Sequence, residues 1–161
     1  MSGYLVRDAT LADLDRIVQF EIEIAVISFD DKAITDTSVH GRRVSAGVKS
    51  PDDVTMVAVA RDAPAAPAEP LGWAWMSARA NALTGERYGN LRSLATAEHP
   101  DRTEIGELLL DAMVEKARAL GVLEIVGKVH VANLAMRTLY KKFDFESVHL
   151  TMRRVLPSGE A

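Results

Sequence analysis

The segment with the strongest chemical signal runs from Asn133 to Phe145. Asn133 stands just before an apolar stripe at helical spacing, so we expect it to cap a helix that carries Tyr140 on its apolar side. A tyrosine with a pKa of ~10 is protonated at neutral pH and can therefore act as a proton donor. Two alternative interpretations stay open: Tyr140 as a half-buried core residue, and Asn133 as a helix cap without a further role.

A second segment, residues 92–107, predicts a strand, a turn and the start of a helix. Because a helix N-terminus presents unsatisfied N–H groups and a partial positive charge, this turn is a candidate anion site. Asp101 and Glu104 oppose that role, since a carboxylate ~6 Å from a phosphate charge costs about 3 kcal/mol at an effective dielectric of ~20. Arg102, between them, could offset part of this cost.

Other kinds of chemistry have less support. The chain has no cysteine, which excludes disulfides, thiolate metal sites and a cysteine nucleophile. None of its four histidines shows ligand spacing, so we expect no metal site. A general base is best sought on or after the first helix, where Glu23 is the first candidate, ahead of Glu21, Asp30 and His40. The alternative interpretation of Glu23 is a solvated surface carboxylate.

The elements that must position these residues form a mixed α/β order around one central sheet. Helices are predicted from Leu11, over 37–48, over 105–120 and from Asn133; strands over 4–7, 54–60, 71–80, 87–97, 122–131 and 148–156. The proline-rich residues 63–70 predict a hairpin loop. Gly121 is expected to end its helix as a left-handed cap.

Length and composition indicate one domain over residues 1–161. The net charge of −4 argues against a nucleic-acid partner. No apolar run approaches the ~18 residues of a membrane span, and the first residues lack the features of a signal peptide, so we expect a soluble, cytoplasmic protein without a membrane partner. Apolar residues expected at the surface of the first helix and the final strands are compatible with a homodimer.

The segment from Asn133 resembles a motif of the GNAT superfamily of acyl-CoA-dependent N-acyltransferases, N-x-x-A-x-x-L-Y-x-x-x-G-F. The matching residues are Asn133, Leu139, Tyr140 and Phe145; Met136 stands where alanine is usual and Asp144 where glycine is usual. The order of elements over about residues 4–155 is also similar to that of the family.

This resemblance implies a splayed mixed central sheet with helices on both faces, in which two middle parallel strands part to admit the pantetheine arm of acetyl-CoA or a related acyl-CoA as co-substrate. Backbone groups of Leu94 and Thr96 would bond that arm, and Tyr140 would protonate the departing thiolate. The implied cofactor-binding residues are Leu94, Ala95, Thr96, Arg102, Thr103, Glu104, Ile105, Gly106, Glu107 and Asn133.

The loop that would receive the pyrophosphate departs from the family pattern [R/Q]-x-x-G-x-[G/A]. Aligned without gaps, residues 101–106 retain only Gly106. The resemblance implies an N-acetyltransferase in which a small-molecule amine attacks the thioester directly in a ternary complex. The alternative is a GNAT-fold binding or regulatory module with lost or altered CoA binding.

Overall fold

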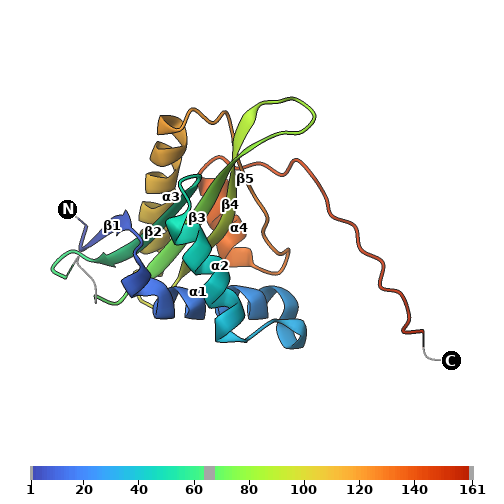
Figure 1. Cartoon of the computed structure of the whole chain (residues 1–161), viewed down its shortest axis with the longest axis horizontal. Coiled ribbons are helices and arrows are strands. Elements are labelled where there is room, and N and C mark those ends of the chain that lie inside the picture. The colour runs from blue at the N-terminus through green and yellow to red at the C-terminus, as the bar shows by residue number, and fades with distance from the viewer. Residues whose placement is uncertain (1, 64–67, 160–161) are drawn as a thin grey trace.

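Five strands form one mixed sheet in the computed structural model of the chain, which describes residues 2–63 and 68–159. The strands are β1 (Tyr4–Asp8), β2 (Asp53–Ala60), β3 (Gly72–Ala80), β4 (Arg87–Thr96) and β5 (Ile125–Gly127). They lie in the order β1-β2-β3-β4-β5 (Figure 1). Neighbouring strands are antiparallel except β4 and β5, which are parallel.

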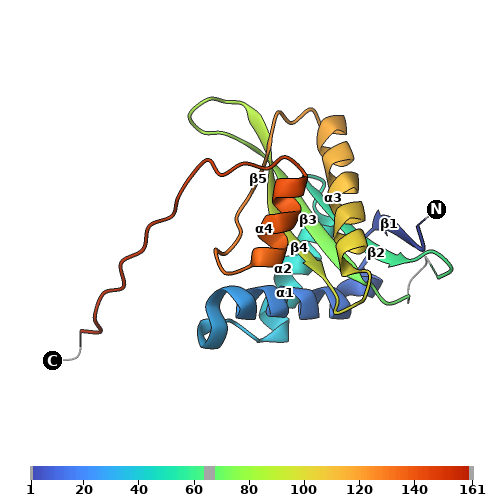
Figure 2. The ribbon, with the colours of Figure 1, turned by 180° about the vertical axis from the view of Figure 1, so that it is seen from behind.

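Helices cover both faces of the sheet (Figures 1 and 2). One face carries α1 (Leu14–Phe29) and α2 (Thr37–Lys49), and the other carries α3 (Arg102–Ala119) and α4 (Leu134–Lys142). Two short 3₁₀ helices, Leu11–Asp13 and Asp30–Lys32, flank α1. Among the described residues, no helix has both the length and the apolar character that crossing a bilayer requires.

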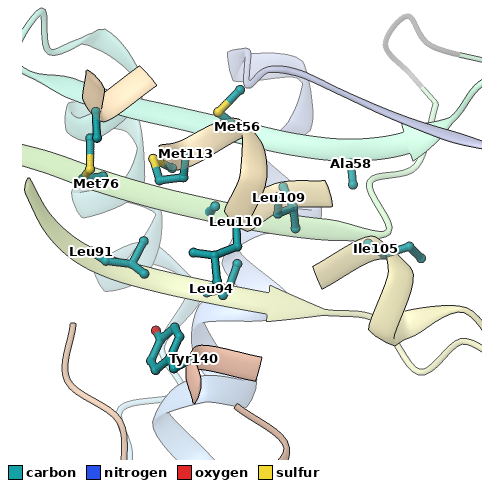
Figure 3. Close-up of a cluster of buried hydrophobic side chains, with 12 residues drawn as sticks. Met56, Ala58, Met76, Leu91, Leu94, Ile105, Leu109, Leu110, Met113 and Tyr140 are labelled. Atoms are coloured by element: carbon teal, nitrogen blue, oxygen red, sulfur yellow. The ribbon is translucent and has the colours of Figure 1, made fainter. Parts of the chain in front are cut away.

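Two hydrophobic cores follow from the alternation of side chains along the strands. Trp73 and Trp75 are two residues apart, and both are buried under α1 and α2. Residues of the opposite parity, such as Ala74 and Met76, pack under α3 together with Leu109 (Figure 3). The central strands are therefore fixed from both sides.

A β-bulge interrupts β4 at Arg92. Trp75 of β3 pairs with Ser93 and Met76 pairs with Leu91, so Arg92 is the extra residue. The Arg92 guanidinium lies 3.7 Å from the ring centroid of Trp75. A bulge bends its strand and increases the local twist. The parallel pairing with β5 ends beside the bulge, at Leu91 and Gly127.

The predicted helices and the first four predicted strands are confirmed, including the left-handed cap at Gly121 (φ +68°). The prediction of a strand over 148–156 was wrong, because these residues are exposed and pair with no strand. The strand predicted over 122–131 is reduced to Ile125–Gly127. The β4–β5 pair consequently lies at one edge of the sheet and not in its middle. Residues 64–67 of the predicted proline-rich loop lie outside the described residues.

Candidate active site

The backbone of β4 is open toward β5 beyond the bulge. The parallel ladder joins only residues 89–91 to residues 125–127. The Ala97 N–H donates to the Leu71 carbonyl on the β3 side. Because backbone groups alternate between the two edges of a strand, Leu94 and Thr96 direct theirs to the opposite edge, where the ladder with β5 has ended. This edge can bond an extended ligand in the manner of an added strand.

Ala95 lies between those two residues and pairs with Trp73 of β3. Its backbone groups therefore face into the sheet, and its buried methyl group packs in the core under α1. Of the three β4 residues predicted to bind the cofactor, Leu94 and Thr96 thus have backbone groups on the open edge.

Tyr140 reaches from α4 to the point where β4 and β5 part. A Cβ atom added to Gly127, the last residue of β5, would lie 3.5 Å from the Tyr140 hydroxyl oxygen. Figure 3 shows this side chain extending from α4 toward β4. The ring stacks on Phe145 with 5.0 Å between centroids. Burial raises the pKa of Tyr140 to about 12, so the hydroxyl is protonated at neutral pH.

Asn133 begins α4, as predicted. Its side-chain oxygen accepts a hydrogen bond from the Met136 backbone N–H at 3.2 Å. Capping therefore occupies the carbonyl oxygen, and a contact with a cofactor would involve the NH₂ end of this amide.

The two acidic residues at the start of α3 are held by the N-terminal segment. The Tyr4 hydroxyl donates to Asp101 at 2.6 Å, and the Ser2 hydroxyl donates to Glu104 at 2.5 Å. The hydrogen bond to Asp101 raises the pKa of Tyr4 to about 12. Arg102 is exposed and lies 3.5 Å from Glu98. This helix end therefore combines outward-pointing N–H groups with a negative local charge.

Gly106, at the position where the family pattern has Gly or Ala, has a packing role. A Cβ atom there would lie 3.2 Å from Leu139 of α4 and 3.6 Å from Thr96 of β4. The missing side chain lets α3 approach both elements closely. Of the neighbouring predicted residues, Ile105 is fully buried, Thr103 is exposed, and Glu107 forms an ion pair with Lys142.

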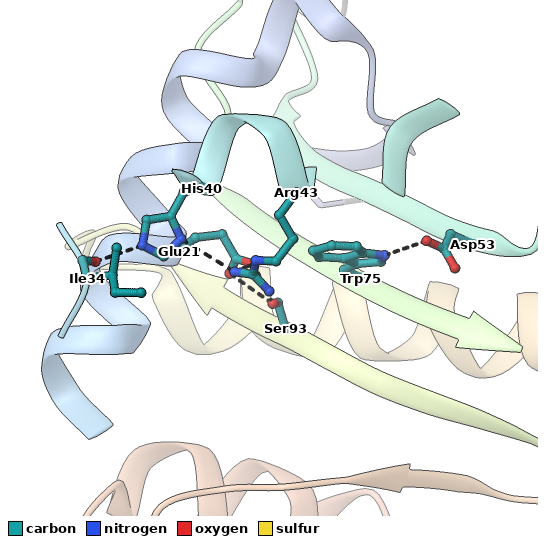
Figure 4. A network of polar contacts seen from close by, with 7 residues as sticks. All are labelled: Glu21, Ile34, His40, Arg43, Asp53, Trp75 and Ser93. Carbon is teal, nitrogen blue, oxygen red and sulfur yellow. Dashed lines mark hydrogen bonds and ion pairs between the residues drawn. The ribbon is translucent and has the colours of Figure 1, made fainter. Parts of the chain in front are cut away.

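A buried polar network lies on the opposite face of β4 (Figure 4). Glu21 of α1 is 2% exposed, and its carboxylate accepts from the Ser93 hydroxyl at 2.8 and 3.0 Å. Arg43 of α2 donates to the same carboxylate at 2.9 Å. The next member is His40, whose Nε2 lies 2.7 Å from the Ile34 carbonyl and whose Nδ1 lies 3.5 Å from Arg43. The network ties both helices to the residue that follows the bulge.

Sequence reasoning named Glu21 only as a secondary candidate. The available signal was its position, four residues after Ile17 and three after Val18, which places a carboxylate on the buried side of α1. Its partners Ser93 and Arg43 carried no local signal. Glu23, the residue chosen from the sequence, has a side chain that is 55% exposed and lies 3.9 Å from Arg16. Within residues 2–63 and 68–159, no group of three His, Asp or Glu side chains could hold a metal ion.

Comparison with known proteins fits this geometry. The family model described as acetyltransferase (GNAT) family matches residues 26–145. The chain belongs to the GNAT acetyltransferase family. No curated protein sequence matches it significantly.

Solved structures share the fold. A mutant protein from Bacillus halodurans superposes with a TM-score of 0.81 at 16% identity, over 95% of this chain and 99% of that one. A transcriptional regulator from Bacillus halodurans C-125 gives a TM-score of 0.74 at 15% identity, with the same coverage of both chains. An aminoglycoside acetyltransferase from an uncultured soil metagenomic sample, in complex with trehalose, gives 0.69 at 14% identity, over 96% and 97%.

Membership of the GNAT family implies an acyltransferase that uses acyl-CoA, and the residues present fit the arm of that co-substrate better than its phosphates. The open edge at Leu94 and Thr96 matches an extended, amide-containing chain. The acidic residues at the start of α3 do not match a diphosphate. Asp144 adopts a left-handed conformation (φ +63°), so the backbone keeps the shape that the family's usual glycine favours.

Proposed function

We propose that this protein is an N-acetyltransferase that transfers an acetyl or related acyl group from acyl-CoA to an amine of a small molecule. The observation that carries the proposal is the open edge of β4 beside the Tyr140 hydroxyl. Backbone donors for an extended ligand and a protonated acid meet there, at the point where two parallel strands separate.

Different residues of the chain would bind the co-substrate and supply the proton. The backbone groups of Leu94 and Thr96 bind the pantetheine arm, and an N–H group near Leu94 polarises the thioester carbonyl. When bound, acyl-CoA supplies the thioester carbon that the amine attacks directly. Tyr140 holds a proton on its hydroxyl oxygen for the sulfur that leaves, since its raised pKa keeps the group neutral at pH 7. The absence of cysteine argues for this direct route over a cysteine acyl-enzyme.

For the proton released by the amine we propose Glu23 as acceptor. Its carboxylate is exposed on α1 and is therefore accessible to a dissolved substrate. Glu21 is less suited to this task, because Ser93 and Arg43 already occupy its oxygens.

A second candidate function is a binding or regulatory module that has lost strong CoA binding. The observation in its favour is the pair of carboxylates, Asp101 and Glu104, at the helix end where the pyrophosphate would lie. One structural neighbour is described as a transcriptional regulator.

Thr96 offers a direct test of CoA binding by isothermal titration calorimetry. Thr96→Pro removes an N–H that faces the open edge, whereas Thr96→Ala keeps it. We expect the wild type to bind CoA and acetyl-CoA, Thr96→Ala to bind within about twofold, and Thr96→Pro to bind about fivefold or more weakly, the effect of one hydrogen bond of ~1 kcal/mol.

Circular dichroism of each variant checks that it is folded. If the wild type failed to bind CoA at millimolar concentration, this result would contradict the proposed acetyltransferase. It would favour the second candidate function, a binding or regulatory module. Equal binding by the two Thr96 variants would instead contradict the assignment of the β4 edge.

A further inference from the structure

Two segments that the sequence predicts as strands are not full strands in the structure. Residues 122–131 form only the three-residue β5, and residues 148–156 are extended without any strand partner. β5 is the last strand of the sheet and pairs with β4 alone, so its other edge is open. An open strand edge presents unpaired N–H and C=O groups that another strand can satisfy.

A hollow of about 410 Å³ adjoins this open edge. It is bordered by the C-terminal half of α3, by residues 122–127 and by the chain just after α4. Its floor includes the apolar residues Val114, Ala117 and Ile125. A strand laid along β5 would cover it.

The C-terminal residues have the pattern of such a strand. Val148, Leu150 and Met152 alternate with His149 and Thr151, which puts the apolar side chains on one face. Leu150 and Met152 are 85% and 86% exposed. Figures 1 and 2 show the segment leaving the body of the molecule beside β5 and extending away from it. Exposed apolar side chains in a regular alternation are typical of a surface that is covered by a partner.

The charges of the two surfaces are complementary. The hollow is lined by three acidic residues and one basic residue, which are Glu124, Asp144, Glu146 and Arg118. The segment that would cover it carries Arg153 and Arg154. Attraction between them favours this pairing over pairing with an acidic partner.

The geometry favours a second molecule over a return of the same chain. Val148 already borders the hollow, and the residues after it point away. To come back, the chain would have to reverse within the segment, yet residues 148–156 contain no Gly, Pro, Asn or Asp, the residues that favour tight turns. A two-fold exchange needs no turn and satisfies both open edges at once.

We propose that residues 148–156 of one molecule pair with the open edge of β5 in a second copy, and that this reciprocal exchange makes the protein a dimer. The exchange extends β5 beyond Gly127 and buries the apolar face of the segment over α3. The proposal is independent of acyl transfer, and its test requires no substrate.

Analytical ultracentrifugation tests the assembly. We expect the wild type to sediment as a dimer of about 35 kDa, twice the 17.5 kDa of one chain, and Leu150→Asp/Met152→Asp to sediment as a monomer. Leu83→Asp is the matched control, because Leu83 is 95% exposed in the β3–β4 connection; this variant should stay dimeric. A monomeric wild type at 100 µM, or a dimeric double variant, overturns the proposal.

Cysteine cross-linking tests the exchange itself, since the chain has no cysteine of its own. A tagged Leu150→Cys chain is mixed with an untagged chain carrying Ile125→Cys or Val126→Cys, two positions that cover both faces of β5. We expect a disulfide between the two chains with one of these partners. In chains carrying both cysteines, a band that migrates as a monomer would show that the segment returns to its own β5, and absence of any cross-link would show a different dimer; either result overturns the exchange.

Discussion

At the scale of single residues, Tyr140 combines a packing role with the proposed chemical one. Its ring stacks on Phe145, while its hydroxyl lies at the end of β5 where the strands part. The same burial that fixes the ring also raises the pKa of the hydroxyl to about 12. The hydroxyl is thereby kept protonated over the whole physiological pH range.

Replacing Tyr140 by Phe should separate these roles. We expect kcat for acetyl transfer to fall about a hundredfold, the typical effect of general acid catalysis, with little change in the KM for acyl-CoA. Tyr88→Phe is the control, because it removes a tyrosine hydroxyl near the start of β4, and it should leave kcat unchanged. Steady-state kinetics measure both. An unchanged kcat in Tyr140→Phe would assign the proton to another donor.

The raised pKa also predicts a stability effect at high pH. Between pH 10 and 12 the unfolded chain loses the Tyr140 proton while the folded chain keeps it, so the free energy of unfolding falls as the pH rises through this range, by roughly 2–3 kcal/mol in total. Tyr140→Phe should lose less stability than the wild type from pH 9.5 to 11.5 in urea titrations. If the free energy of unfolding fell equally with pH in the two proteins, this result would contradict the pKa of about 12.

Glu23→Gln tests the proposed proton acceptor. We expect kcat/KM for the amine to fall about ten- to a hundredfold without a change in Tm, because the side chain is exposed and makes only a 3.9 Å contact with Arg16. Glu115→Gln, an exposed carboxylate on α3, is the control and should keep full activity. If Glu23→Gln is as active as the control, the amine loses its proton to solvent or to another group.

At the scale of elements, two glycines of α2 have opposite structural roles. A Cβ atom on Gly47 would lie 2.4 Å from the Trp75 ring, which is fully buried, whereas one on Gly41 would lie 4.0 Å from Val18. The close approach at Gly47 sets the distance between α2 and the sheet, and Gly41 is under no such constraint.

Alanine at each position should therefore change stability in opposite directions. Gly41→Ala should raise the free energy of unfolding by about 0.5–1 kcal/mol through helix propensity, and Gly47→Ala should lower it by about 1–3 kcal/mol through overpacking. Chemical denaturation measures both. Equal effects of the two substitutions would mean that Trp75 adjusts freely to the added methyl group.

The elements also show how far local sequence predicts this fold. The helices and β2, β3 and β4 have a periodicity or β-branched content that identifies each of them without a partner. β5 and residues 148–156 have a similar content, but a strand needs a neighbour to complete its ladder, and the neighbour is not encoded locally. The motif around Tyr140 predicted α4 and identified Tyr140 as a candidate residue on it. The bulge at Arg92 and the link from Glu21 to Ser93 depend on pairing between distant segments, which no spacing in the chain reveals.

At the scale of the whole molecule, the net charge of −4 is not favourable to an anionic ligand such as the proposed CoA. The start of α3 adds Asp101 and Glu104 to a region that would face a polyanionic ligand. Their hydrogen bonds to Tyr4 and Ser2 link this acidity to the N-terminal strand. The proposed binding of CoA would therefore be coupled to the packing of the N-terminal segment through the same carboxylates.

Reversing this charge should tighten CoA binding. We expect Asp101→Arg/Glu104→Gly to lower the Kd for CoA about tenfold at low salt, less than the unscreened estimate because both residues are exposed. Asp111→Arg makes a charge change of the same size as Asp101→Arg about 15 Å along α3. At 0.1 M salt this distance exceeds the Debye length of about 10 Å, so Asp111→Arg should have little effect on the Kd at that salt concentration. Calorimetry at low and high salt distinguishes the two variants. An unchanged Kd in the double variant would indicate that the phosphates bind away from this helix end.

The extra residue in β4 has a consequence for what a shortened chain would do. Deleting Arg92 would make β4 a regular strand, and a straight β4 could continue its ladder with the residues after Gly127. The backbone N–H groups of Leu94 and Thr96 would then donate to β5 instead of to a ligand. The gap between β4 and β5 would be closed by strand pairing. Deletion of this single residue is therefore expected to leave a folded protein that no longer binds the proposed acyl-CoA.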